Sequence, residues 1–427
     1  MRDTVSEAVA GAPAAFISVA RVPYMTCAII GLGGLFAGVT GPLLSAFIPV
    51  LVQDAVGDRR SIIGLIMAID NVLLLLLVPW AGAASDRASA QGRGRLGLVI
   101  GGFVLASAGM ALIVSPLAAG IVGLIATMTV LYTGINLQRS PFQALVADAV
   151  PSQFRAFATG SVTFQMCVGA IVFLMLGQTL GMRPAFLIAA GTVLGIAAAI
   201  AVSVRSPSTI SSSASEATFR SLLDAGWSAV RGAVPGMRAI FLASLLLQLT
   251  FQTFTTWYSL HGTERFGVRA EDAATGMIAW AVGGVIGALP AGVIGTRIGR
   301  RNAMLLGFAL MAVALLALDR VTTIGQAIPL LAFASACWTL PTVSAYPLFV
   351  EPVPAARRGV LSALFLLSMA LGGGIGDPLN GVLFDLVGSY RPLFLMMAAY
   401  TTLAFVAVLF VPRGMGEAGS ASCPGAA

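Results

Sequence analysis

Gly82-Ala-Ala-Ser-Asp86-Arg87 returns some two hundred residues later as Gly292-Val-Ile-Gly-Thr296-Arg297, and the second copy continues as Ile-Gly299-Arg300-Arg301. A second pattern, Asp148-x-x-Pro151-x-x-x-Arg155, returns at a similar offset as Glu351-x-x-Pro354-x-x-x-Arg358. Two patterns repeated in the same order indicate two homologous halves. In membrane proteins, such halves usually face each other across a substrate path.

The composition is that of an integral membrane protein. Hydrophobic residues make up 58% of the 427 positions and charged residues only 10%, which is too apolar for a soluble domain. Runs of roughly 18 or more apolar residues can each cross the ~30 Å hydrocarbon layer as a helix. The sequence therefore predicts an all-α fold with twelve transmembrane helices, at residues 25–52, 61–84, 96–115, 119–147, 157–180, 184–204, 238–261, 273–295, 302–318, 326–349, 360–383 and 392–411.

One long hydrophilic interruption, residues 205–236, divides six predicted helices from six. It predicts an N-terminal bundle over residues 1–204 and a C-terminal bundle over 237–427, joined by a cytoplasmic linker. Apolar residues recur at helical spacing within the linker, at Phe219, Leu222, Leu223, Trp227 and Val230. This pattern indicates a short amphipathic helix on the inner membrane surface, and we favour a plain linker over a regulatory role.

The arginines predict the orientation. With both termini in the cytoplasm, sixteen arginines fall in inner segments and seven in outer loops, as the positive-inside rule requires of a multi-pass protein of the inner (plasma) membrane. The net charge of +7 is dispersed over loops and forms no stripe for nucleic acid. Residues 1–24 lack the pattern of a removable signal peptide.

The chain offers little for catalysis. It has no Lys and one histidine, His261, which we expect at the membrane surface beside Glu264 and Arg265. The four cysteines show neither metal-binding nor disulfide spacing, and no catalytic triad or nucleotide-binding loop can be assembled. We therefore expect no enzyme activity, no cofactor and no metal.

The turn after the second predicted helix carries a family resemblance. Gly82-x-x-x-Asp86-Arg87 resembles the signature loop of the major facilitator superfamily, and Gly292, Arg297 and Arg300 match it in the second half, where Thr296 replaces the acid. The resemblance implies two pseudo-symmetric six-helix bundles and a cytoplasmic gate held by charges. Asp148, Arg155, Glu351 and Arg358 would belong to the same gate. The alternative is that these arginines are topology signals only.

A narrower resemblance rests on the second and fourth predicted helices. Arg139-Ser-Pro-Phe-Gln143-Ala-Leu-Val-Ala-Asp148, together with Asp70-Asn71, is similar to the sucrose/proton symporter group, near the glycoside-pentoside-hexuronide:cation symporters. The loop after Arg87 departs from that group, since it lacks the adjoining Arg pair and Pro. The resemblance implies symport of a small, polar, glycoside-like solute with H⁺, and Na⁺ is less favoured because Asp70 stands alone.

Asp70 lies sixteen residues before Asp86, or ~24 Å along a helix. An ionised carboxylate at that depth costs several kcal/mol unless it is paired or protonated. Arg139 is the expected partner. We favour a proton-coupling role for both residues over a static ion pair. Asp377 is the second choice of coupling acid, and its place after a glycine-rich break predicts a solvated side chain.

Polar residues at spacings of three and four form stripes on three predicted helices. The stripes are Thr129, Tyr132, Asn136, Arg139 and Gln143; Gln248, Gln252, Thr255 and Ser259; and Ser335, Trp338, Thr342 and Tyr346. In the superfamily that the chain resembles, the first, fourth, seventh and tenth helices line the central cavity. Amides beside aromatic rings suit a hydroxyl-rich ligand that can stack on a ring. The expected substrate-binding residues are Tyr132, Asn136, Gln143, Gln248, Gln252, Thr255, Tyr258, Trp338 and Thr342.

Two other functions stay open. Methionines in the helices are compatible with an exporter of hydrophobic metabolites or drugs, although Met also serves as adaptable packing. The other alternative hypothesis is a membrane assembly factor that has lost transport. Buried Asp70 and Arg139 argue against it. The expected partners are a small-molecule substrate, H⁺ and membrane lipid, with no nucleic acid, and we expect a monomer.

Overall fold

The computed structural model describes residues 24–92, 94–150, 155–204, 236–350 and 358–413. These residues form α-helices and one short 3₁₀ helix, η1 (Pro116–Ala118). The first group of helices is α1 (Tyr24–Val56), α2 (Arg60–Met67), α3 (Ile69–Ala90), α4 (Leu96–Ile113), α5 (Gly120–Ala149), α6 (Arg155–Leu180) and α7 (Met182–Ser203). The second group is α9 (Met237–Phe266), α10 (Ala270–Ile298), α11 (Arg300–Arg320), α12 (Ile324–Val350), α13 (Arg358–Val387) and α14 (Leu393–Leu409).

The predicted twelve membrane crossings are confirmed. In the described part of the chain, nine spans are long and apolar enough to cross a membrane, and one of them, Arg60–Ala90, is made of α2 and α3 together. The bent helix α10, which turns by 47° before Pro290, is the tenth. The 30-residue α13 and the 17-residue α14 complete the set. The amphipathic helix expected within residues 205–236 lies outside the described residues.

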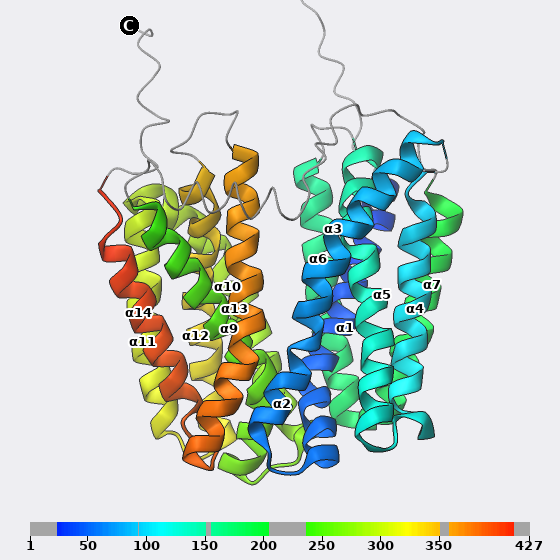
Figure 1. Ribbon diagram of the computed structural model, residues 1–427. Helices are drawn as coiled ribbons and strands as arrows, with labels where there is room; N and C mark the ends of the chain where they lie inside the picture. The colour runs from blue at the N-terminus through cyan, green and yellow to red at the C-terminus, as the bar shows by residue number, and fades with distance from the viewer. Residues whose placement is uncertain (1–23, 93, 151–154, 205–235, 351–357, 414–427) are drawn as a thin grey trace, which may run out of the picture.

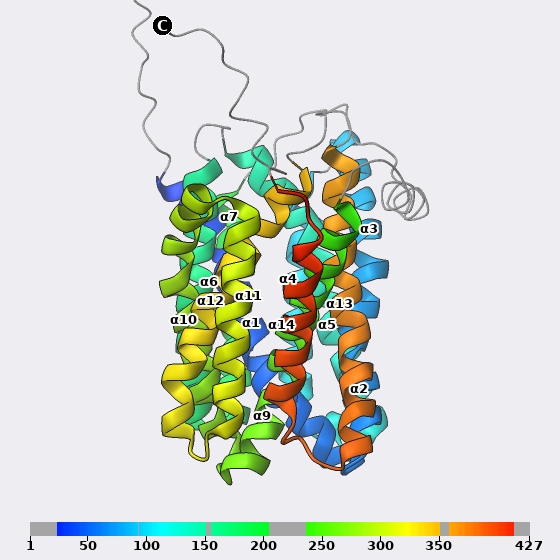
Figure 2. The same cartoon turned by 90° about the vertical axis from the view of Figure 1, so that its left-hand side faces the viewer.

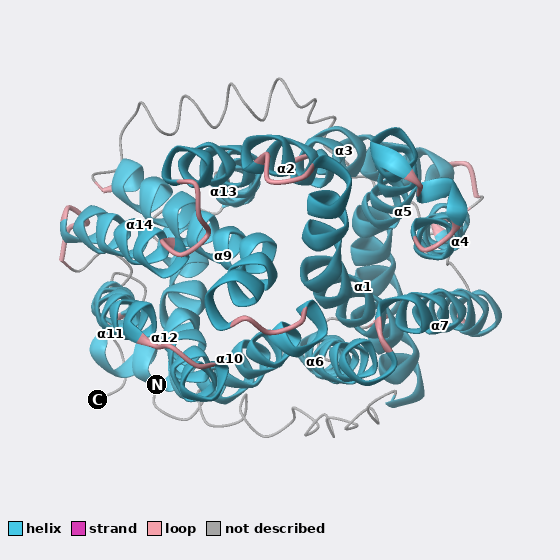
Figure 3. Cartoon of the chain, turned by 90° about the horizontal axis from the view of Figure 1, so that it is seen from below, coloured by secondary structure: helices cyan, strands magenta, loops and turns pink. Residues whose placement is uncertain are grey.

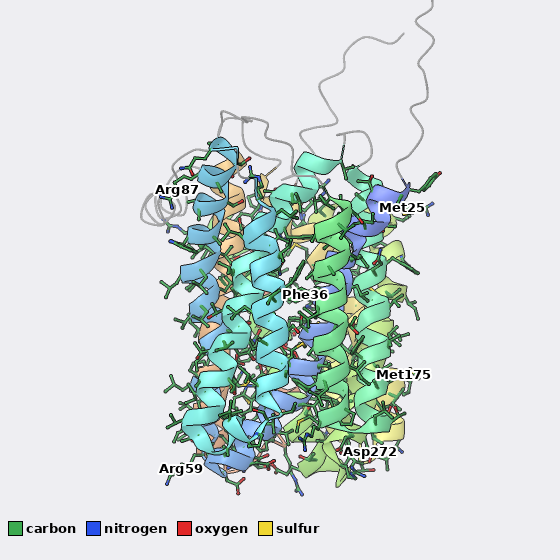
Figure 4. The ribbon with its side chains drawn as sticks, turned by 90° about the vertical axis from the view of Figure 1, so that its right-hand side faces the viewer. Met25, Phe36, Arg59, Arg87, Met175 and Asp272 are labelled. Atoms are coloured by element: carbon green, nitrogen blue, oxygen red, sulfur yellow. The ribbon has the colours of Figure 1, made fainter. Side chains whose placement is uncertain are left out.

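The two groups of helices stand side by side as two bundles (Figure 1). The chain leaves α7 and enters α9 on one side of the molecule, which we call the linker side, and the opposite side is the far side. Figure 1 shows the bundles meeting at the far side and diverging toward the linker side, and Figure 2 shows the second bundle in front of the first. Seen from below in Figure 3, α2 and α3 lie beside α13, and α6 lies beside α10. Arg59 and Asp272 mark the far end in Figure 4, and Arg87 marks the linker end.

Glycines let neighbouring helices touch backbone to backbone within each bundle. A side-chain carbon at Gly34 or Gly38 of α1 would lie 1.9 or 2.0 Å from a carbonyl oxygen of α6. In the second bundle, Gly283 and Gly287 of α10 stand in the same relation to α12, at 2.0 and 2.6 Å. Such close approach is how helices associate in lipid, where apolar side chains alone give little driving force. The glycine-rich runs of the sequence are therefore packing surfaces.

Candidate functional site

One face of α13 meets α2 and α3 across the boundary between the bundles. Four residues spaced by four lie along it: Gly373, Asp377, Gly381 and Asp385. A side-chain carbon at Gly381 would lie 2.5 Å from the carbonyl oxygen of Arg60, and one at Gly64 would lie 2.2 Å from that of Asp377. Nearer the linker side, Gly373 packs against Asn71, and a side-chain carbon at Gly373 would lie 2.6 Å from Asn71 Oδ1. We call this meeting of residues 60–71 with residues 373–385 the far-side contact.

Asp385 caps α2 from the opposite bundle. Its Oδ1 accepts a hydrogen bond from the backbone N–H of Arg60 (2.9 Å), and its Oδ2 accepts one from that of Ser61 (2.8 Å). The residue at the N-cap position of α2 itself, Arg59, makes no side-chain capping bond. The first N–H groups of a helix lack intrahelical partners, and a carboxylate there is favoured by both hydrogen bonding and the helix dipole. The far-side contact thus completes a helix end that the first bundle leaves uncapped.

A charged cluster surrounds this cap. The Arg60 guanidinium lies over the ring of Tyr390, 4.6 Å from its centroid, which is the geometry of a cation–π interaction. Glu264 at the end of α9 accepts hydrogen bonds from the Ser389 hydroxyl and from the backbone N–H of Tyr390 (2.9 Å). Arg60, Glu264 and Tyr390 line a surface pocket of about 320 Å³. A further bond joins the bundles on this side, from Gln178 Nε2 to Thr275 Oγ1 (2.7 Å).

Asp70 is held by an amide of α5. Asn136 Nδ2 donates to Asp70 Oδ1 (2.8 Å) and to the carbonyl oxygen of Tyr132 (2.9 Å), while Asn136 Oδ1 is buried without a partner. Arg139 does not form the expected ion pair with Asp70 in this conformation, although it is near enough for its charge to act on the carboxylate. The structure therefore brings Asp70, Asn136 and Tyr132 together and leaves Arg139 exposed beside them.

Asp377 is fully buried, with 0% of its surface exposed. The expectation of a solvated side chain is wrong, because α13 continues unbroken through Gly372–Gly374 and packs against α2 and α9 at this level. Gln252 Nε2 donates to Asp377 Oδ2 (2.9 Å), and Asp377 Oδ1 has no hydrogen-bond partner. Asp70 of the opposite bundle is close enough to act electrostatically on Asp377. Two carboxyl groups, one from each bundle, thus approach the same interface.

The three predicted polar stripes share a gradient of exposure. On α5, Tyr132 and Asn136 are buried, whereas Arg139 and Gln143, nearer the linker side, are exposed. On α12, Ser335 is buried, Trp338 and Thr342 are half-buried, and Tyr346 is exposed. On α9, Ser259 is buried, and Thr255, Gln252 and Gln248 are half-buried. The stripes are accessible toward the linker side and closed toward the far side. This is an inward-facing arrangement if the linker lies in the cytoplasm.

Aromatic rings fill the second bundle behind these stripes. Phe251 stacks on Trp338 (centroids 5.0 Å apart, 20° between planes), and Phe254 stacks on Trp280 (4.2 Å, 21°). Three polar atoms here are buried without hydrogen-bond partners: Trp338 Nε1, Ser335 Oγ and Tyr258 Oη. Because buried polar groups are normally paired, such atoms are open to a ligand or to water. Trp280 is absent from the sequence-based site because it lies on α10, outside the three stripes.

The other predicted substrate residues have local partners. Thr342 Oγ1 donates to the carbonyl oxygen of Trp338 (2.8 Å), and Thr255 Oγ1 donates to that of Phe251 (3.1 Å), so both hydroxyls bond to their own helices. Gln248 packs at the α9–α13 contact, where Gly372 would place a side-chain carbon 2.9 Å from its Cβ. These three residues border the site through their helices.

The first signature copy forms a compact charged turn on the linker side. Arg95, which the sequence analysis did not single out, forms an ion pair with Asp86 and donates to Ser85 Oγ (3.1 Å). Arg87 is exposed. A side-chain carbon at Gly82 would lie 2.8 Å from Ser140 Oγ of α5. Among the described residues, the signature acid Asp86 therefore forms its ion pair with Arg95, within the same turn.

The second signature copy is arranged differently. Gly292 has open space around its Cα, and Thr296 Oγ1 donates to the carbonyl oxygen of its own helix at Val293 (2.8 Å). Arg297 is exposed and Arg300 is half-buried. Arg301 donates to the carbonyl oxygens of Val411 (2.7 Å) and Leu409 (3.1 Å) at the end of α14. Of the remaining predicted gate residues, Glu351 lies outside the described residues, as do the side chains of Asp148, Arg155 and Arg358.

His261 is buried, with 1% of its surface exposed, so its predicted surface position is wrong. The segment that follows α13 covers it: Nδ1 lies 2.9 Å from the carbonyl oxygen of Tyr390, and the ring packs edge-on against Phe394 at 4.8 Å. Its sequence neighbours Glu264 and Arg265 lie nearer the end of α9. The histidine thus belongs to the packing of the far side.

Two six-helix bundles with polar stripes and carboxyl groups at their interface define a membrane transporter, not an enzyme. The family model of the Major Facilitator Superfamily matches residues 30–286 and 263–421, and the chain belongs to this superfamily. No curated protein sequence matches the chain.

Solved transporter structures share this fold at low sequence identity. A D-xylose-proton symporter matches with a TM-score of 0.72 and 16% identity, over 93% of this chain and 99% of its own. The nucleoside transporter NupG matches with a TM-score of 0.71 and 14% identity, over 92% and 100%. A bacterial homolog of the human lysosomal transporter Spinster, in an inward-facing unoccupied conformation, matches with 0.69 and 15%, over 92% and 95%. These likenesses establish the fold.

Proposed function

We propose that this protein is a proton-coupled secondary transporter of a small, polar, glycoside-like solute that works by alternating access. The observation that carries the proposal is the Asp70–Asn136 pair. A carboxyl group within a membrane helix, held by one neutral amide and lying beside an exposed Arg139, is suited to gain and lose a proton. The solved proteins of similar fold include symporters of D-xylose and of fucose with protons.

The coupling follows from competition for Asp70. When Asp70 is ionised, the charge of Arg139 attracts it and the Asn136 amide donates to it. Protonation removes the negative charge and frees Arg139 to interact with substrate at the exposed end of the α5 stripe. The relative stability of the two alternating-access conformations then differs between the proton-bound and the proton-free protein. Such a difference is the condition for a ligand to shift a conformational equilibrium. Asp70 and Arg139 are the proton-coupling residues of this proposal.

The substrate site is assigned to the inner faces of α5, α9 and α12. The Phe251–Trp338 stack offers a ring face, and Trp338 Nε1, Ser335 Oγ and Tyr258 Oη offer unpaired hydrogen-bonding groups. A hydroxylated ring can use both, stacking on the indole while its hydroxyls pair with these atoms. Gln143 and Gln252 add amides on either side of the interface.

The orientation follows from the arginines. We place the linker side in the cytoplasm, with both termini there and the chain in the inner membrane as a monomer. Residues 1–204 and 237–427 then act as two rigid halves, joined by the segment 205–236. The cytoplasmic gate is assigned to the two signature turns, in which only the first retains an acid, Asp86.

The test is solute uptake into proteoliposomes with and without an imposed pH gradient. A panel of radiolabelled mono- and disaccharides, glycosides and nucleosides is compared with hydrophobic drug-like dyes. We expect a saccharide or glycoside to accumulate only with the gradient, and Asp70→Asn to abolish the accumulation while retaining solute exchange. Asp54→Asn, an exposed acid at the end of α1, is the matched control. Full gradient-driven accumulation by Asp70→Asn sinks the proposal.

The panel also separates the alternatives. Gradient-driven efflux of the dyes, with no saccharide uptake, would establish the exporter of hydrophobic metabolites or drugs. No flux of any solute would favour the non-transporting assembly factor. Replacing the H⁺ gradient by a Na⁺ gradient identifies the coupling ion.

A further inference from the structure

Asp377 occupies the middle of the far-side contact. It lies one helical turn from Gly373 and one from Gly381, and its carbonyl oxygen is the atom that a side-chain carbon at Gly64 would strike. Asp385, two turns further on, is exposed, and both of its carboxylate oxygens accept hydrogen bonds from N–H groups of α2. The two acids share a face of α13 but have opposite environments. Only Asp377 is sealed when the bundles meet.

The donors around the sealed carboxyl group are all neutral. With 0% exposure, it receives a hydrogen bond from Gln252 at Oδ2 and none at Oδ1. The Thr256 hydroxyl and the Trp257 indole N–H lie next to the carboxyl group as further neutral donors, although the Trp257 N–H has no partner at hydrogen-bond distance in this conformation. An isolated buried carboxylate is strongly disfavoured unless a cation or several donors compensate it, whereas a neutral carboxyl group tolerates one donor.

Among the described residues, the helices around Asp377 supply no compensating cation. The titratable groups that face it are Asp70 of α3 and Tyr132 of α5, both from the other bundle, and neither carries positive charge. From α9 come the neutral side chains Gln252, Thr256 and Trp257. From α2 it meets the backbone at Gly64, while the Arg60 guanidinium lies over the ring of Tyr390. A charge on Asp70 would add repulsion to a charge on Asp377.

We propose that Asp377 is a second proton-binding site and that it must hold a proton for the far-side contact to close. When α13 separates from α2, the carboxyl group meets the far-side solution, where it can ionise. Closing the contact returns it to a dry site, so closure takes up one proton per molecule. Acid on the far side thus favours the closed far side, and alkali favours its opening.

This assigns different steps to the two buried acids. Asp70 faces the accessible polar stripe of α5 and couples to substrate, whereas Asp377 lies within the contact that closes the far side. The inference rests on the alternating-access part of the proposed function and does not depend on which solute is carried.

The experiment measures the far-side distance between the bundles as a function of pH. Spin labels are placed at Leu117→Cys, which is 68% exposed, and at Thr322→Cys, an exposed turn residue of the other bundle. The native cysteines Cys27, Cys167, Cys337 and Cys423 are replaced by serine in the full-length chain. Double electron–electron resonance in lipid nanodiscs then reports the fractions of short and long distances between about pH 5 and about pH 9, a range in which buried carboxyl groups of proteins are known to titrate.

In the otherwise unchanged protein, we expect the long-distance fraction to rise with pH. Asp377→Asn keeps the shape of the neutral carboxyl group, and we expect it to stay at the short distance across the whole range. Asp70→Asn should still show a pH response of the far side, with its midpoint moved because one repelling charge is removed, although it loses gradient-driven accumulation, so failure of the coupling proposal is distinguishable from failure of this one. A pH response that survives in Asp377→Asn overturns the inference. So does the absence of a pH response in the protein that retains Asp377.

Discussion

The Asp385 carboxylate, on the last turn of α13, accepts a 2.9 Å hydrogen bond from the backbone N–H of Arg60, the first residue of α2. The two residues belong to different bundles and are 325 positions apart in the chain. The start of a helix in one half is therefore stabilised only while the other half is in contact. This makes the cap a direct energetic link between local helix structure and the position of the bundles.

Removing that cap should open the far side. Asp385→Ala leaves the N–H groups of Arg60 and Ser61 to water, and loss of an N-cap costs about 1 kcal/mol, roughly a five-fold shift of a two-state equilibrium. The long far-side distance should gain population by that factor in the spin-label assay. Asp54→Ala removes an exposed acid on the same side whose carboxylate caps no N–H group of α2, and it should leave the distances unchanged.

Adding one methyl group to the contact should also hold the bundles apart. Gly64→Ala would place Cβ 2.2 Å from the Asp377 carbonyl oxygen, and backbone cannot yield as a flexible side chain can. We expect a folded protein whose short-distance fraction is lost. Gly101→Ala, in α4, meets open space and is the matched control. Persistence of the short distance in Gly64→Ala would mean that α2 and α13 are not in register as described.

Arg60 and Tyr390 should be energetically coupled. Arg60→Gln removes the cation and Tyr390→Leu removes the ring, and cation–π pairs contribute about 0.5–2 kcal/mol. A double-mutant cycle on the closed-to-open ratio of the far side should return a coupling energy in that range. Additive effects of the two substitutions would show that the 4.6 Å approach carries no energy of its own.

The two signature glycines should differ in tolerance. Gly82→Val would drive a branched side chain into Ser140 of α5, whereas Gly292→Val enters open space. Overpacking costs about 1–3 kcal/mol, so the first variant should unfold at a lower temperature in detergent than the second. Equal thermal stability would contradict the unequal packing of the two copies.

The sequence predicted the helices well and their contacts unevenly. An acid inside an apolar run is conspicuous, so the sequence indicates Asp70. It predicts its partner Asn136 only as a substrate residue, since a stripe shows which face of a helix is polar and not what lies opposite. The burial of His261 was missed because Tyr390 and Phe394, which cover it, are far along the chain. The spacing of four that joins Gly373, Asp377, Gly381 and Asp385 is visible in the sequence, and it could have indicated a packing face that carries acids.

The class of fold can be predicted from the sequence alone, because the length of an apolar run and the repetition of a short pattern are local properties. Twelve crossings in two related halves follow from them without knowledge of any contact. The packing of the two bundles, in contrast, sets which residues close the far side, why Asp377 is buried and why Asp385 is exposed. These depend on the register between α2 and α13, which is set by backbone approach at Gly64 and Gly381. Such approach has no signature in either helix taken alone.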